Sequence, residues 1–163
     1  AFTADRGFRT GDMGFLDDEG FLYITGRIKE QYKLENGKYV VPAPLENELS
    51  LSPFINQVFV HGANRPFNVA LIVAEIAALH EWCEVNGIAG SDEALCKHER
   101  VQSLMREQVD KYSSGFKQFE KIKKFAIITE EFSVENGLLT PKMSVKRQKV
   151  LERYDDKLQG LYA

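Results

Sequence analysis

The chain has 163 residues, of which 44% are hydrophobic and 28% charged, and its formal net charge at pH 7 is −3. This length suits one domain, or two small ones that share a core, and the composition is typical of a globular protein. Apolar runs such as residues 69–74 are far shorter than the about 20 residues of a membrane-spanning helix, so this sequence predicts no such helix.

The first residues, AFTADR, carry neither the basic start nor the apolar stretch of a targeting segment, so we expect a cytoplasmic protein. Cys83 and Cys96 lack the spacing of a metal site, and His61, His80 and His98 are scattered. We therefore expect reduced thiols, and neither a disulfide framework nor a metal centre. Because the sequence opens without Met and begins like the middle of a protein, we also expect a piece of a longer chain.

The first predicted elements are a strand and a hairpin. A turn signal at residues 17–20 (DDEG) precedes the strand-forming residues 21–25 (FLYIT). Residues 31–34 and 38–41 are predicted to pair, because the Asn-Gly dipeptide between them favours a tight turn.

A compact core is predicted from residue 42 onward. Prolines near the start and Pro53 beyond the end favour a short helix over residues 42–51. Residues 67–75 form a nearly continuous apolar run, typical of a strand buried on both faces, which we expect to pair with a strand at 55–61. The later elements are predicted from apolar periodicity and turn signals: helices around 76–83 and 101–112 separated by 87–91, a strand at 125–129, a turn at 135–137, a short strand at 138–139 and a last helix at 144–158.

These elements predict an α+β fold: a small mixed or antiparallel sheet with flanking helices, preceded by a short β-hairpin linker segment. The first 27 residues look less attached to this core than residues 45–163. We therefore predict a domain boundary between residues 1–28 and residues 29–163.

The charge is unevenly distributed. Residues 1–60 carry six basic and nine acidic side chains, whereas residues 117–149 carry eight basic and four acidic ones. A basic segment suits an anionic ligand such as phosphates, a cofactor or nucleic acid. Charge alone favours the simpler interpretation, a solvated basic face.

Two polar residues that follow glycines are candidate nucleotide ligands. Asp12 follows Gly11, and a carboxylate that accepts two hydrogen bonds suits the paired hydroxyls of a ribose. Arg27 follows Gly26, and its planar fork of donors suits a hydroxyl pair or a phosphate. Taken singly, each is explained more simply, Asp12 as a turn residue and Arg27 as a basic strand end.

Two further segments present lysines. The predicted hairpin at residues 33–40 (KLENGKYV) carries Gly37 at its tip, where a backbone can approach a ligand closely. Residues 136–142 (NGLLTPK) end with Lys142 on a loop before a basic helix, where a lysine can neutralise developing phosphoryl charge. In isolation, turn chemistry and a surface lysine remain the simpler explanations.

In their order and spacing, these segments resemble the C-terminal region of the adenylate-forming superfamily, which comprises acyl-CoA synthetases, luciferases and the adenylation domains of peptide synthetases. The resemblance covers essentially the whole chain. Its landmarks are residues 8–12 with Gly14, 20–29, 33–34 with Gly37, 39–40, 44–49, 135–142 and 146–147. Residues 64–73 and 136–141 most resemble the long-chain fatty acyl-CoA synthetase branch.

The resemblance implies a role for each matching residue. Asp12 matches a carboxylate that holds the ribose hydroxyls of ATP and then of the acyl-adenylate, and Arg27 matches an arginine that contacts the nucleotide. Lys29 stands at the hinge about which the small domain rotates. The face presented to the coenzyme A thiol in the second reaction is matched by Lys33, Gly37 and Tyr39.

Lys142 matches the lysine that reaches the α-phosphate and the carboxylate during adenylation, although the local string departs from the branch. The long-chain branch has Thr-Pro-Thr, an aliphatic residue and then Lys, whereas here the lysine falls two places earlier, in TPKMS. The earlier position agrees with the Gly-Lys pattern of the wider superfamily, with Pro141 in place of Gly. Lys142 is therefore the predicted catalytic lysine, with Lys146 as the reserve.

The implied activity is that of an ATP-dependent long-chain fatty acid–CoA ligase. A fatty carboxylate attacks the α-phosphate of ATP, the small domain rotates about Lys29, and the thiol of coenzyme A then attacks the acyl-adenylate. ATP, Mg²⁺ and coenzyme A are the implied cofactors of the full-length enzyme, with none held tightly by this piece. The implied partner is an N-terminal adenylation domain, and whether that domain contacts a membrane is left open. Without the N-terminal domain, we expect this piece to have no ligase activity.

Three alternatives stay open. The same landmarks suit a fatty acyl-AMP ligase that loads a carrier protein. The second alternative, from a different functional class, is a small basic nucleic-acid-binding module. The third is a purely structural interaction domain. The aromatic residues near the basic segment, Phe116, Phe119 and Phe125, suit a core better than a stacking platform, so we expect no nucleic-acid partner.

Overall fold

The computed structural model describes residues 2–4 and 6–163. Within this part of the chain the strands are β1 (Asp12–Leu16), β2 (Leu22–Arg27), β3 (Tyr32–Lys33), β4 (Tyr39–Val40), β5 (Ile55–His61), β6 (Asn68–Ala74) and β7 (Ile122–Ile128). The helices are α1 (Pro42–Leu49), α2 (Ile76–Val85), α3 (Asp92–Lys97), α4 (Glu99–Tyr112) and α5 (Arg147–Gly160), and a 3₁₀ turn covers Ile28–Glu30. Within the same described residues, no helix is both long and apolar enough to cross a membrane.

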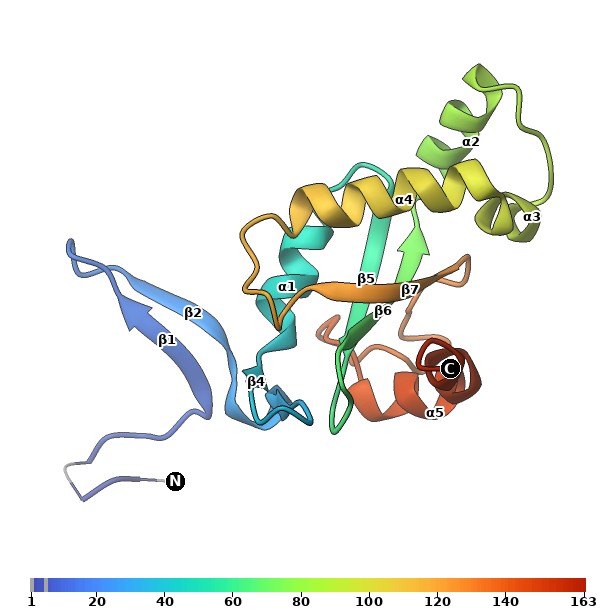
Figure 1. Cartoon of the computed structure of the whole chain (residues 1–163). Coiled ribbons are helices and arrows are strands. Elements are labelled where there is room, and N and C mark those ends of the chain that lie inside the picture. Colours follow the sequence, from blue (N-terminus) through green and yellow to red (C-terminus); the bar gives the residue numbers. More distant parts are fainter. Residues whose placement is uncertain (1, 5) are drawn as a thin grey trace.

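The centre of the fold is a sheet with the strand order β5-β6-β7 (Figure 1). β5 runs antiparallel to β6, and β7 runs parallel to β6. Every residue of β6 is buried, in agreement with its apolar run, because helices cover both faces of this central strand. The sheet is therefore mixed, and the predicted α+β class is confirmed.

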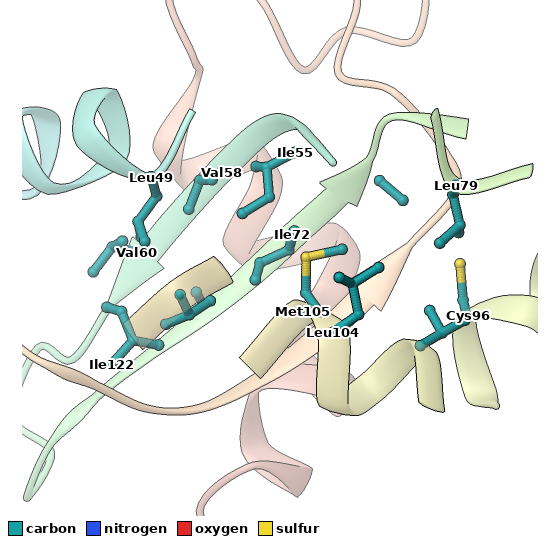
Figure 2. Packing of buried hydrophobic residues seen from close by; sticks show 14 of the residues in the cluster. Leu49, Ile55, Val58, Val60, Ile72, Leu79, Cys96, Leu104, Met105 and Ile122 are labelled. Carbon is teal, nitrogen blue, oxygen red and sulfur yellow. The ribbon is translucent and has the colours of Figure 1, made fainter. Parts of the chain in front are cut away.

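The two faces of the sheet pack against different helices, because successive side chains of a strand point to opposite faces. On one face, Ile72 of β6 lies in a cluster with Leu49 of α1 and Met105 of α4 (Figure 2). On the other face, Leu71 lies in a second cluster with Val150 of α5. Each fully buried aliphatic side chain of this kind contributes about 1.5–3 kcal/mol to the free energy of unfolding.

The β1–β2 hairpin projects from this body as a separate two-stranded unit (Figure 1). The rings of Phe15 and Tyr23 stack across it with a centroid distance of 5.1 Å, yet the two residues are 55% and 49% exposed. In the described part of the chain, the first buried apolar residue is Leu34. The hairpin therefore contributes no buried side chain to either core cluster.

Two elements differ from the sequence predictions in the N-terminal and middle parts. β1 is a strand that no pattern predicted, and it pairs with β2 over its whole length. The predicted helix around residues 101–112 is preceded by the separate helix α3, and the two are divided at His98. The ring nitrogen Nδ1 of His98 accepts the N–H of Arg100 and so caps the start of α4.

The segment before the last helix also differs. α5 begins at Arg147 rather than at Ser144, because the residues before it form a turn in which Met143 has a φ of +61°. The predicted strand at 138–139 is reduced to an isolated bridge between Leu139 and Val145. A tight turn therefore replaces the first predicted turn of the helix.

Candidate functional site

Asp12 and Arg27 face each other across the β1–β2 hairpin. Their Cα atoms are register partners, and the Arg27 Nε atom lies 3.2 Å from Oδ1 of Asp12. The Asp12 side chain is 31% exposed and that of Arg27 is 69% exposed, so the pair is accessible to a ligand. A carboxylate beside a guanidinium offers acceptors and donors together, which suits a vicinal diol.

A groove of about 800 Å³ lies beside this pair. One wall is formed by the hairpin, with Asp12 and Arg27, and another by α1, with Glu46. The third wall is the start of α5 and the residues before it, including Ser144 and Arg147. The structure therefore brings the predicted nucleotide ligands close to the segment that follows the predicted catalytic lysine.

Lys142 lies at the tip of the turn that precedes α5. The N–H of Met143 donates to the carbonyl of Thr140 at 2.8 Å, and the N–H of Thr140 donates to the carbonyl of Ser144 at 2.8 Å. The Lys142 side chain is exposed, and it is not among the residues that line the groove. The turn thus presents the ammonium group to solvent next to the groove rather than inside it.

Lys146 is also exposed and lies immediately before α5. Its backbone N–H donates to the carbonyl of Leu138 at 2.8 Å, which fixes its backbone but not its ammonium group. Among the described residues, the ammonium groups of Lys142 and Lys146 form no hydrogen bond or ion pair. The geometry therefore leaves both lysines as candidates.

The other predicted residues lie outside the groove. Lys29 is exposed in the 3₁₀ turn at Ile28–Glu30, directly after the hairpin. The β3–β4 hairpin turns at Gly37, whose φ of +83° lies in the left-handed region that glycine tolerates. Lys33 places its Nζ atom 5.9 Å from the ring centroid of Tyr39, which is 58% exposed. The hairpin thus forms a second accessible surface, separate from the groove.

A partly buried ion pair that sequence reasoning missed also lines the groove. Nη1 of Arg147 lies 2.8 Å from Oε1 and 3.1 Å from Oε2 of Glu46, and the two side chains are 19% and 14% exposed. Burial raises the pKa of Glu46, and the positive charge of Arg147 opposes this shift. Both residues belong to segments that carried the family resemblance, but no local pattern marks them as partners, since they are 101 positions apart.

The acidic and basic groups of the groove suit some ligand groups better than others. The groove is lined by four carboxylates, those of Asp12, Glu30, Glu46 and Glu48. It is lined by only two cationic side chains, those of Arg27 and Arg147. The groove therefore suits the hydroxyls of a nucleoside better than its phosphates, which would need the neighbouring lysines. Within the described residues, no group of three or more His, Cys, Asp and Glu side chains is arranged to hold a metal ion.

Comparison with known proteins identifies similar chains. A family model described as AMP-binding enzyme C-terminal domain matches residues 29–163. Long-chain-fatty-acid–CoA ligase 1 of Homo sapiens is 35% identical over 166 aligned positions, which cover 100% of this chain and 24% of that protein. Long-chain-fatty-acid–CoA ligase FadD15 of Mycobacterium tuberculosis is 37% identical over 164 positions, which cover 99% of this chain and 27% of that protein.

A solved structure shares the fold. It is the A domain of a carboxylic acid reductase from Segniliparus rugosus, in complex with AMP and a co-purified carboxylic acid. The TM-score is 0.79 at 27% sequence identity, and the match covers 99% of this chain and 24% of that one. The chain thus spans about a quarter of the length of the relatives that it matches.

Proposed function

The chain belongs to the AMP-binding enzyme C-terminal domain family, and from this we propose that it is the mobile C-terminal domain of an ATP-dependent long-chain fatty acid–CoA ligase. In the full-length enzyme a fatty carboxylate attacks the α-phosphate of ATP, which gives acyl-AMP and releases pyrophosphate, and the thiol of coenzyme A then attacks the acyl carbonyl, which gives the thioester and releases AMP. The names of the relatives support both the acid and the acceptor. The 163-residue chain has no ligase activity alone, because it supplies only part of the site.

The groove next to the Lys142 turn is the observation that carries most weight. Asp12 and Arg27 stand at one wall, and the segment that leads from Lys142 into α5 forms another. A diol-binding pair and a lysine-bearing turn on neighbouring walls suit the ribose and a phosphate of one nucleotide.

Each residue has one task in this mechanism. Asp12 accepts hydrogen bonds from the ribose hydroxyls, and Arg27 donates to the same nucleotide. The Lys142 ammonium group stabilises the negative charge that develops on the α-phosphoryl oxygens as the carboxylate attacks. Rotation about Lys29 then withdraws Lys142 from the site, since one rigid domain serves two reactions. The surface that replaces it next to the thiol carries Lys33, Gly37 and Tyr39.

Mg²⁺ neutralises phosphate charge in reactions of this class. We assign none of the residues of this chain to its binding. We also place the enzyme in the cytoplasm, which the free thiols of Cys83 and Cys96 support.

Substitution of the candidate lysines in the full-length enzyme tests the proposal. Lys142→Ala should slow acyl-adenylate formation, measured by exchange of labelled pyrophosphate into ATP, on the order of 100-fold. The matched control is Lys149→Ala, which removes an exposed lysine of α5 that pairs with Glu152. Thioester formation from supplied acyl-adenylate should remain unchanged in both variants.

Four outcomes would revise the proposal. A large effect of Lys146→Ala with none of Lys142→Ala would move the catalytic role to the reserve lysine. Normal adenylation in the Lys142→Ala/Lys146→Ala double variant would overturn the mechanism. Activity with a carrier protein but not with coenzyme A would favour a carrier-loading ligase, and salt-dependent binding of nucleic acid would favour the basic-module alternative.

A further inference from the structure

β5 is an edge strand whose open side is closed by side chains. It pairs with β6 on one side only, and Val60 is the register partner of Ala70. The N–H of Val60 donates to Oε1 of Glu46 at 2.7 Å, and its carbonyl accepts a hydrogen bond from Nη2 of Arg147. In an antiparallel pair, alternate residues direct both backbone groups away from the partner strand, and Val60 is such a residue.

Glu46 and Arg147 therefore together make the hydrogen bonds to Val60 that a further strand beside β5 would otherwise make. The carboxylate receives the backbone donor, the guanidinium serves the backbone acceptor, and the two groups bind each other at 2.8 Å. The guanidinium carbon also lies 4.3 Å from the ring centroid of Phe59, which adds a cation–π contact. The planar guanidinium group donates to several acceptors at once in a fixed geometry, whereas a lysine ammonium group cannot reproduce that arrangement of donors.

This pair also fixes the start of α5. Arg147 is the first residue of that helix. The bridge between Leu139 and Val145, together with the bond from the Lys146 N–H to the Leu138 carbonyl, makes residues 138–147 one connected unit. Anchoring Arg147 to α1 and β5 therefore anchors the turn that carries Lys142.

We propose that Glu46 and Arg147 are positioning residues that lock the Lys142 turn to the open edge of β5 and thereby set the rate of the adenylation step. This inference rests on the proposed function, because it requires the Lys142 turn to act in adenylation. The pair acts through the turn, so its loss should impair the reaction that uses Lys142 and spare the reaction that uses the β3–β4 hairpin.

The test uses the full-length enzyme with Arg147→Lys and Glu46→Gln, measured in both half-reactions. Arg147→Lys keeps the charge but loses the fork, and Glu46→Gln keeps an oxygen for the Val60 N–H but loses the ion pair. Each should lower kcat of pyrophosphate exchange at least about 10-fold, since small displacements of a catalytic group are costly. The KM for ATP and thioester formation from supplied acyl-adenylate should both stay within about 2-fold.

The matched control is Arg153→Lys, which alters another arginine–carboxylate pair, that of Arg153 on α5 with Glu130 in the loop after β7. It should leave both half-reactions within about 2-fold of the parent, since its side chain is 47% exposed and such pairs contribute little. A thermal unfolding midpoint measured for every variant separates positioning from loss of fold.

The outcomes are distinguishable. If Lys142→Ala slows adenylation but neither Arg147→Lys nor Glu46→Gln does, the positioning role is wrong and the proposed function stands. If Lys142→Ala has no effect, the inference about the Lys142 turn is overturned, and the proposed mechanism itself fails only if the Lys142→Ala/Lys146→Ala double variant also adenylates normally. If both pair variants unfold, or lose both half-reactions equally, the pair is structural only and the inference is overturned.

Discussion

His61 is a half-buried histidine at the end of β5, and its surroundings oppose protonation. The pKa of His61 falls from 6.5 to about 4. Burial is the largest cause of this fall, the positive charges of Arg147 and Arg65 add to it, and the negative charge of Asp155 opposes it. Because the folded-state pKa lies below the unfolded one, the unfolded chain binds the proton first as the pH drops. The stabilising contribution is therefore present above about pH 6.5 and is lost as the pH falls from there to about 4.

We expect this loss to be on the order of 2 kcal/mol, less than the full shift implies, because the ring is partly exposed. Urea unfolding of the 163-residue chain near about pH 7 and about pH 4 measures it. The His61→Gln variant should lose less stability over this interval than the parent chain. An equal loss in both would show that other groups account for the acid sensitivity.

At the scale of elements, Asn68 joins three separate parts of the fold. Its side chain is fully buried at the start of β6. Oδ1 accepts the hydroxyl of Tyr32 from β3 at 2.7 Å, and Nδ2 donates to the carbonyls of Phe119 and Glu120 at 2.9 and 3.0 Å. Burial raises the pKa of Tyr32, so this hydroxyl remains a donor across the whole useful pH range.

Asn68→Ala should lower the free energy of unfolding by about 2–4 kcal/mol, because it leaves two partly buried carbonyls and a partly buried hydroxyl without partners. Tyr32→Phe removes only one of these bonds and should cost about 1 kcal/mol. Denaturant unfolding of the two variants gives the comparison. A cost of Asn68→Ala no larger than that of Tyr32→Phe would mean that water replaces the lost amide.

The elements that the sequence predicted well are those specified by neighbouring residues. The apolar run of β6 implied burial on both faces, and the Asn-Gly dipeptide implied the β3–β4 hairpin, and both are found. The parallel pairing of β7 with β6 was not predictable in this way, because about 50 residues separate the strands and no local pattern encodes their partner. The split between α3 and α4 was missed because it depends on one capping side chain, that of His98.

In the candidate site too, features specified by neighbouring residues were predicted and long-range contacts were not. The nucleotide roles of Asp12 and Arg27 were predicted from the family resemblance, but their contact requires β1, a strand that no pattern indicated. The pair Glu46 and Arg147 was missed, because a contact across 101 positions arises only when α1, β5 and α5 assemble. Local chemistry therefore identifies candidate ligands, whereas long-range packing decides how they are held.

At the scale of the whole molecule, the β1–β2 hairpin keeps a large share of its apolar surface in contact with solvent. Leu16, Phe21, Leu22 and Ile24 are 61–67% exposed. Clustered exposed apolar side chains of this kind mark a surface that contacts another protein segment. In the proposed full-length enzyme we expect this surface to face the N-terminal adenylation domain, which would place residues 1–28 with that domain rather than with residues 29–163.

A chain of residues 29–163 should therefore fold without the hairpin. Both core clusters draw their residues from Tyr32 onward. The hairpin does pack on the body at Gly26, where an added Cβ would meet the Val41 side chain at 2.5 Å. We expect deletion of residues 1–28 to change the free energy of unfolding by no more than about 1 kcal/mol, because little apolar area is lost from the core. The shortened chain should also bind less of the dye ANS, which reports exposed apolar surface. Denaturant unfolding and dye fluorescence of the two chains measure both effects. A shortened chain that is unfolded, or destabilised by several times this amount, would place the hairpin within the same folding unit and the boundary elsewhere.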